Sequence, residues 1–199
     1  MIKIIDYKAG NAPSVMHAVN HLGHKAEFVR GAQDFTDATH IILPGVGSAK
    51  ATMESLGEMN LLATLEKMVL THKLPFLGIC VGLQVLFEHS EEEDTKCLGW
   101  LKGRVVKYDT DMVRVPQMGW NQVSFAKKTP LDIDPSGYFY FVNSYHATPD
   151  NADCVWATAD YNGNFVAAIQ SDNIYATQFH VEKSGEEGLQ VLNKFCCYS

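Results

Sequence analysis

The first half of the chain alternates short apolar segments with stretches that have helical spacing. Strand-like segments occupy residues 2–5, 26–29, 40–43 and 76–79. Helices are predicted at residues 14–22, 60–73 and 81–88. Ser14 is a suitable N-cap for the first helix, and Gly23 is suited to end it. Strands that alternate with helices predict right-handed crossovers and a parallel sheet with helices on both faces.

The second half has a different pattern, in which strand-like segments follow one another across short turns. They occupy residues 103–108, 113–115, 121–125, 138–142, 155–159, 165–170 and 174–179. We expect antiparallel additions to the sheet edge or a small second sheet. From Ser184 onward, apolar residues at helical spacing predict a closing helix, and residues 90–94 (SEEED) are expected to form a solvated loop. The chain is therefore predicted to be a single α/β domain over residues 1–199.

The composition of the chain restricts the kinds of molecule that it is expected to bind. The 199 residues carry a formal net charge of -7, whereas binding to nucleic acid relies on a basic face. No apolar run approaches the length of a membrane span. The five cysteines lack disulfide or metal-site spacing, so we expect reduced thiols, no metal and no cofactor. A cytoplasmic protein that binds neither nucleic acid nor membrane is predicted.

Cys80 lies where a buried strand gives way to a helix. Gly78 and Gly82 flank it two residues to each side, which is the cysteine counterpart of the G-x-S-x-G nucleophile elbow. A helix start favours the thiolate, and the N–H of Val81 would point at an oxyanion formed by attack on a carbonyl. A buried cysteine is more often a small apolar core residue. The paired glycines at a strand–helix junction favour the nucleophile.

A cysteine nucleophile requires a histidine base and a third group that orients the histidine. His180 follows the strand-like segment 174–179, and Glu182 comes two residues later. Because residues i and i+2 of a strand share a face, both side chains are predicted to converge on one site. An H-x-E pattern alone is weak, and it gains weight from the elbow earlier in the chain.

A glycine turn, Pro44 to Gly47, directly follows the strand at residues 40–43. Open α/β sheets build their sites at such carboxyl ends of strands. The N–H of Val46 or Gly47 is a candidate second oxyanion donor, although a plain turn has the same composition. A dinucleotide fingerprint is excluded because Lys50 stands where its third glycine is required.

Together these residues resemble the class I glutamine amidotransferases and, among them, the glutaminase subunits of imidazole glycerol phosphate synthases. The resemblance covers nearly the whole chain. Its motifs, in order, are DYKAGNAPSV (6–15), PGVG (44–47), GICVGLQ (78–84), PQMGWN (116–121), YFYFVNSY (138–145) and QFHVEKSG (178–185). The resemblance implies a flavodoxin-like three-layer α/β sandwich and no cofactor.

The resemblance also implies a role for each matching residue. Cys80 would attack the side-chain amide of L-glutamine, His180 would protonate the departing ammonia, and Glu182 would orient His180. The substrate would be held by Gly47, Gln84, Ser144 and Tyr145. A TIM-barrel cyclase would form a heterodimer with the chain and receive the ammonia. The residues expected to meet this partner are Asn11, Trp120, Asn121 and Lys183.

Three residues depart from the family pattern. Val181 stands where proline is usual, Val81 where leucine is usual and Asn143 where histidine is common. These departures leave open a paralogue that supplies ammonia to another acceptor enzyme, such as one that aminates a sugar nucleotide. A partner-free cysteine hydrolase would not explain MGWN or Lys183. A non-catalytic binding module would be expected to have lost a member of the Cys–His–Glu set.

Overall fold

The computed structural model describes residues 1–7, 10–131 and 136–198. Lys8 and Ala9, which belong to the N-terminal motif, lie outside the described residues. The four first-half strands pair in parallel in the order β2–β1–β3–β4, and β13 joins them in parallel beside β4, although its segment was predicted among the antiparallel additions. Their bounds are Ile2–Ile5 (β1), Ala26–Val29 (β2), His40–Leu43 (β3), Phe76–Ile79 (β4) and Ile174–Thr177 (β13). The predicted parallel core is therefore confirmed.

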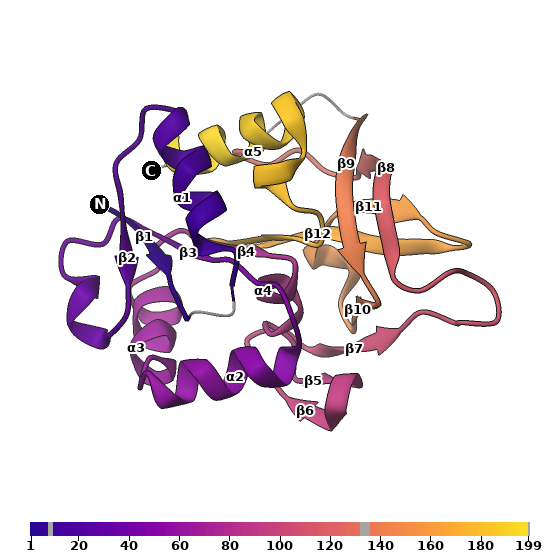
Figure 1. Cartoon of the computed structure of the whole chain (residues 1–199), viewed down its shortest axis with the longest axis horizontal. Helices are drawn as coiled ribbons and strands as arrows, with labels where there is room; N and C mark the ends of the chain where they lie inside the picture. Colours follow the sequence, from indigo (N-terminus) through magenta and orange to yellow (C-terminus); the bar gives the residue numbers. More distant parts are fainter. Residues whose placement is uncertain (8–9, 132–135, 199) are drawn as a thin grey trace.

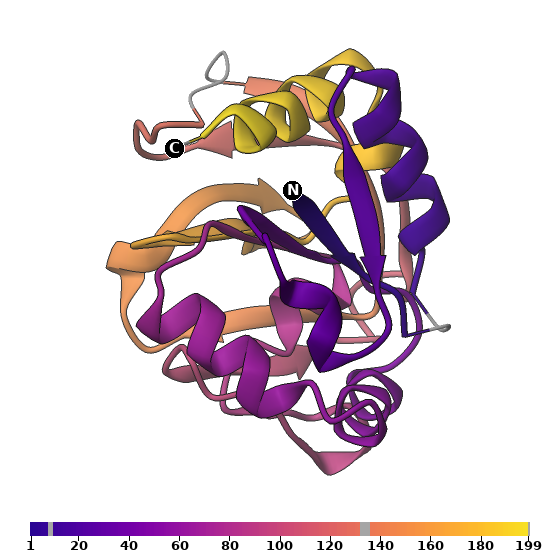
Figure 2. The ribbon, with the colours of Figure 1, turned by 90° about the vertical axis from the view of Figure 1, so that its left-hand side faces the viewer.

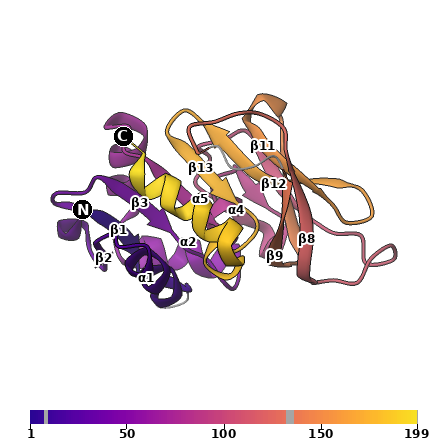
Figure 3. The same ribbon diagram turned by 90° about the horizontal axis from the view of Figure 1, so that it is seen from above.

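The second half extends this sheet and does not form a separate one. From β13 the order continues β12–β10–β7–β5–β6, while β11, β8 and β9 branch from β12. The bounds are His89–Ser90 (β5), Thr95–Lys96 (β6), Gly103–Lys107 (β7), Gln117–Phe125 (β8), Ser136–Asn143 (β9), Tyr145–Pro149 (β10), Val155–Asp160 (β11) and Asn164–Ser171 (β12). Figure 3 shows the branch gathered at one end of the molecule. The α/β class with antiparallel additions in the C-terminal half is confirmed.

Helices cover the sheet on two sides (Figures 1 and 2). One layer holds α1 (Ala12–His21) and α5 (Gly185–Cys197). The other holds α2 (Ala49–Glu58), α3 (Leu62–Glu66), the π-helical turn η2 (Lys67–Thr71) and α4 (Val81–Gln84). Single 3₁₀ turns lie at Ala32–Phe35 (η1), Glu92–Asp94 (η3), Ala152–Cys154 (η4) and Val181–Lys183 (η5). The molecule is thus a three-layer sandwich, and within the described residues no helix is long and apolar enough to cross a bilayer.

Several predicted boundaries were wrong for local reasons. Helix α1 begins at Ala12 with Asn11 as its N-cap, because Pro13 suits the first turn of a helix and Ser14 already lies inside it. Residues 113–115 form no strand, since Pro116 follows at once and has no N–H for a ladder. Ser90, predicted to lie in a solvated loop, is buried in β5.

Other elements differ in extent. Helix α4 ends at Gln84, four residues before the predicted end at residue 88. Helix α2 was not predicted; Ser48 caps it by accepting a hydrogen bond from the N–H of Ala51 at 3.2 Å. The predicted helix at residues 60–73 divides into α3 and η2.

Aromatic packing joins the branch to the parallel core beside the carboxyl end of β13. The Phe179 ring lies 4.2 Å from that of Phe139 and 5.8 Å from that of Phe141, both on β9. All three side chains are fully buried, and each contributes on the order of 1.5–3 kcal/mol by leaving water. Phe179 thus anchors the segment in which Gln178 and His180 are its immediate neighbours.

Candidate active site

The turn between β4 and α4 places Cys80 in a conformation that few non-glycine residues adopt. Its φ is 55° and its ψ is -105°, and its N–H donates to Thr177 O on β13 at 2.7 Å. The flanking glycines are required by space, because a Cβ at Gly78 would collide with Gly82 O and a Cβ at Gly82 with Leu43 O. The strain at Cys80 is held by close packing of three strand ends.

His180 and Glu182 come together by a different route from the one predicted. Strand β13 ends at Thr177, so strand alternation does not set their geometry. His180 is extended and Glu182 lies in the 3₁₀ turn η5, which brings His180 Nδ1 to 2.9 Å from Glu182 Oε1. Ser184 stabilises the turn, since its hydroxyl donates to His180 O and accepts from the N–H of Tyr140.

The charges of this pair are set by burial and by neighbouring groups. Burial alone would lower the pKa of His180, but hydrogen bonds and charge interactions with Cys80 and Glu182 raise it to about 10. Burial would raise the pKa of Glu182, and the hydrogen bond and charge of His180 lower it overall. The two side chains are 3% and 0% exposed, so the imidazolium and carboxylate face each other with little water. His180 therefore carries a proton that it can donate near Cys80.

Asn11 contacts the same carboxylate. Although it is the N-cap of α1, its side chain makes no cap hydrogen bond. Instead, Asn11 Nδ2 donates to Glu182 Oε1 at 2.8 Å. The sequence had placed Asn11 only at a partner interface, and nothing in its spacing from Glu182 signalled this contact.

A chain of side-chain amides lies beneath the sulfur of Cys80. Gln84 Nε2 donates to Tyr145 O at 3.0 Å and to Gln178 Oε1 at 3.1 Å. Gln178 Nε2 in turn lies 3.5 Å from Cys80 Sγ. Gln178 was not predicted as a site residue; the available signal was a polar residue within an apolar segment that ends beside the elbow.

The PGVG loop packs directly on the elbow. A Cβ at Gly45 would lie 2.7 Å from Val81 Cβ, so the loop backbone approaches the start of α4 closely. Val46 and Gly47 follow at the rim, where Gly47 is exposed and has a φ of 98°. The structure therefore places both candidate oxyanion donors, the loop and the N–H of Val81, on the same side of the strand ends.

Ser144 and Tyr145 lie at the break between β9 and β10, close to the nucleophile. Val142 O, two residues earlier, is 3.8 Å from Cys80 Sγ. Tyr145 O accepts hydrogen bonds from both Gln84 and Asn143. The break between β9 and β10 thus lies next to the sulfur through Val142 and is bonded to Gln84 through Tyr145 O.

The four predicted partner residues separate into two groups. The Trp120 ring is 55% exposed and lies beside Gly185, two residues after the exposed Lys183. Asn11 contacts the same turn, because its side chain donates a hydrogen bond to Glu182. Asn121, in contrast, donates from its side chain to Asp160 O on β11 at 2.7 Å, so it is held against the sheet.

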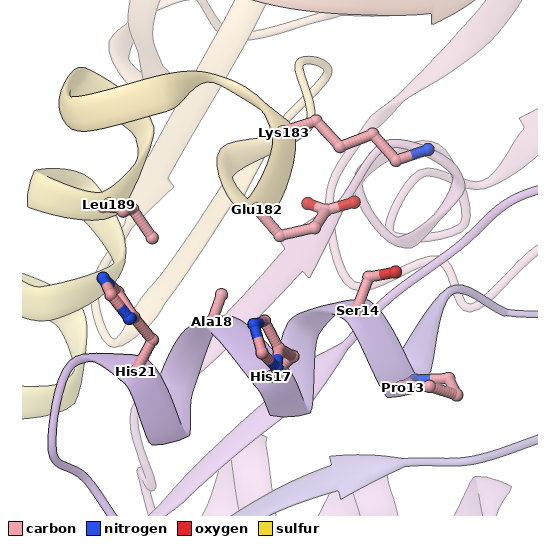
Figure 4. A pocket seen from close by; sticks show the side chains of 8 residues that line it. All are labelled: Pro13, Ser14, His17, Ala18, His21, Glu182, Lys183 and Leu189. Atoms are coloured by element: carbon pink, nitrogen blue, oxygen red, sulfur yellow. The ribbon is translucent and has the colours of Figure 1, made fainter.

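A cavity of about 540 Å³ opens between α1 and the segment from η5 to α5 (Figure 4). Glu182 and Lys183 line it together with residues of α1, including His17 and His21. Cys80 and Gln84 are not among the described residues that line it. The cavity therefore adjoins the outer side of the Glu182 turn and is distinct from the surroundings of the sulfur.

Comparisons with known proteins place this geometry in context. The family described as glutamine amidotransferase class-I matches residues 3–197. The imidazole glycerol phosphate synthase subunit HisH of Methanocaldococcus jannaschii is 44% identical, over 98% of both chains. The protein of the same name from Leptospira interrogans is 39% identical, again over 98% of both.

Solved structures agree in fold at lower sequence identity. A glutamine amidotransferase crystal structure has a TM-score of 0.78 at 17% identity and covers 98% of each chain. PurLQS from Thermotoga maritima has a TM-score of 0.76 at 18% identity, covering 99% of this chain and 97% of that one. The flavodoxin-like arrangement expected from the sequence is therefore confirmed.

Proposed function

The chain belongs to the class I glutamine amidotransferase family, and on that premise we propose that it is the glutaminase subunit of an imidazole glycerol phosphate synthase. It would hydrolyse L-glutamine to glutamate and ammonia. The observation that carries the assignment of residues is the buried Glu182–His180 pair, whose histidine is kept protonated by Cys80 and Glu182. The subunit acts as a single domain over residues 1–199. Its five free thiols suit a cytoplasmic enzyme.

The proposed reaction begins with attack of Cys80 Sγ on the side-chain amide carbon of glutamine. The resulting oxyanion accepts a hydrogen bond from the N–H of Val81 and a second from the Val46–Gly47 segment. His180 donates its proton to the leaving nitrogen, so the C–N bond breaks, ammonia departs and a thioester remains. His180 then takes a proton from water, which attacks the thioester through a second oxyanion and releases glutamate.

Gln84 is proposed to orient the substrate through its amide oxygen. Both hydrogens of its Nε2 are used by Tyr145 O and Gln178 Oε1, so Oε1 is left to accept from the α-ammonium group of glutamine. The backbone of Gly47, Ser144 and Tyr145 completes the proposed substrate site.

A TIM-barrel cyclase is the proposed partner and acceptor of ammonia. Support comes from exposed apolar side chains on β8 and β9, where Met118 is 66%, Trp120 55% and Tyr138 59% exposed. Such a patch marks an interaction surface, and Trp120 places it next to the turn that carries Glu182 and Lys183. Docking there would cover the outer side of the active site.

The test is glutamate release by the purified chain, alone and with a cyclase and its ribonucleotide ligand. We expect slow hydrolysis by the isolated subunit and strong stimulation by the liganded cyclase, because a correctly aimed oxyanion donor changes the rate by about 10²–10³. Equal rates would refute coupling to the cyclase. Stimulation only by another acceptor enzyme would favour the paralogue, which the departures at Val81, Asn143 and Val181 leave open.

A further inference from the structure

Gln178 is a fully buried polar side chain in direct contact with the nucleophile. Its exposed fraction is 0%, and its main-chain N–H is bonded to Ala167 O at 2.8 Å. A buried amide side chain costs free energy unless its polar atoms have partners. Here the partners are the Gln84 amide on one side and the sulfur of Cys80 on the other.

The orientation of the Gln178 amide follows from Gln84. Gln84 presents its donor atom, Nε2, which also donates to Tyr145 O. The atom of Gln178 that meets this donor must be the acceptor, Oε1, at 3.1 Å. The NH₂ group of Gln178 is therefore turned toward Cys80 Sγ, at 3.5 Å.

The protonation state of the sulfur decides which neighbouring group can form a hydrogen bond with it. Val142 O, at 3.8 Å, is an acceptor and can interact favourably only with the S–H of the thiol. The N–H of Gln178 is nearer, and a hydrogen bond to an ionised acceptor is roughly twice as strong as one between neutral groups. The shorter contact therefore favours the anion.

We propose that Gln178 donates a hydrogen bond that holds Cys80 as a thiolate, and that Gln84 is the residue that positions this donor. The inference rests on the proposed function, in which the thiolate attacks glutamine. It gives Gln84 two tasks, since one end of its amide faces the substrate and the other fixes Gln178. His180 stabilises the sulfur by charge, whereas Gln178 does so by a directed dipole that does not change with pH.

The experiment measures the rate at which iodoacetamide alkylates Cys80 across the pH range in which thiols titrate. Tryptic peptide 74–96 contains no other cysteine, so mass spectrometry isolates the signal of this residue. The variant Gln178→Met keeps the length of the side chain and removes the donor. In this variant we expect the pH at which alkylation reaches half of its maximal rate to rise by about one unit.

The matched control is Gln170→Met, the same substitution on the neighbouring strand β12. Gln170 Nε2 donates to Asp172 O and does not contact Cys80, so its profile should coincide with that of the wild type. Gln84→Met should move the profile in the same direction as Gln178→Met and by less, because the Gln178 amide is then free to turn. A profile of folded Gln178→Met identical to the wild type would overturn the proposal.

Folding is checked by thermal unfolding of each variant. If Gln178→Met does not fold, Gln178→Glu decides, since it keeps the shape of the side chain and replaces the donor by a carboxylate that repels the thiolate. Its profile should move upward by more than one pH unit, and an unmoved profile would again overturn the inference. Alkylation needs no glutamine turnover, so a chain that failed to hydrolyse glutamine would still report the role of Gln178.

Discussion

The elbow around Cys80 and the β8–β9 ribbon represent opposite ways of presenting functional side chains. At the elbow, backbone segments pack so closely that there is no room for a Cβ at Gly78 or Gly82. On the ribbon, Met118, Trp120 and Tyr138 project into solvent with more than half of their surface exposed. The groups proposed for chemistry are thus fixed by packing, and those proposed for binding are not. Substitutions at the elbow should change activity and leave stability nearly unchanged. Substitutions on the β8–β9 ribbon should change the response to the partner and leave basal activity and stability nearly unchanged.

The largest effect is expected for Cys80→Ala. Without the sulfur no thioester can form, so glutamine hydrolysis should fall below detection. The free energy of unfolding should change little, because only a small buried group is removed. Glutamate release and denaturant unfolding measure the two quantities, with Cys197→Ala, at an exposed thiol, as the control. Substantial activity in Cys80→Ala would remove Cys80 from its assigned role.

Loss of the base should exceed loss of the group that orients it. His180→Asn removes both proton transfers, which corresponds to a decrease of about 10²–10⁴ in kcat. Glu182→Gln keeps a hydrogen-bonding partner for His180 and should be less impaired. Steady-state kinetics of both variants provide the comparison, and a more damaging Glu182→Gln would reverse the assigned roles.

The pH dependence of stability should reveal the charged histidine. The pKa of His180 is raised from its ordinary 6.5 to about 10. A group whose pKa is higher in the folded state contributes its full stability below pH 6.5 and loses it as the pH rises through about 10. Between these limits the free energy of unfolding of the wild type should therefore fall relative to that of His180→Asn. Parallel pH series of urea unfolding for the two proteins would show a constant difference if His180 were neutral.

A smaller effect is expected for Asn11→Ala. This change removes the hydrogen bond to Glu182 Oε1 and leaves the carboxylate buried beside His180. A hydrogen bond to a charged group is worth about 1.5–3 kcal/mol, so a decrease in kcat of about 10- to 100-fold is expected. The exposed Asn20 of the same helix provides Asn20→Ala as the control for a general effect on α1. Equal kinetics of the two variants would show that the contact does not act on catalysis.

The smallest effects on the isolated chain are expected for the exposed residues of the β8–β9 ribbon and of the neighbouring turn η5. Trp120→Ala and Lys183→Ala should change stability by only about 0.5 kcal/mol, as is usual for surface positions. Their basal glutamate release should match the wild type, while stimulation by the cyclase should decrease. Titration of each variant with the liganded cyclase measures this, and full stimulation in both would move the partner surface elsewhere.

The sequence predicted four of the five strands of the parallel core, because each is a short apolar segment in the half of the chain that also carries helical patterns; β13 was predicted as an antiparallel addition and pairs in parallel with β4. It also predicted the turn at Cys80, because the two glycines that such a tight strand–helix turn requires lie close to the cysteine in the sequence. It placed His180 and Glu182 together through strand alternation, whereas the structure uses the turn η5. Contacts across the chain, such as Asn11 with Glu182 and Gln178 with Cys80, leave no periodic signal and required the fold.

The segment from Gln178 to Glu182 contacts the nucleophile, the aromatic core and Asn11 through different side chains. Gln178 meets Cys80, Phe179 packs against β9, and His180 and Glu182 bond to each other. Replacing one of these side chains alters only its own contacts, whereas inserting or deleting a single residue would displace all of them at once. The length of this stretch should therefore be even more strictly maintained than its residue types, so chain-length variation among functional relatives should be confined to the outer loops.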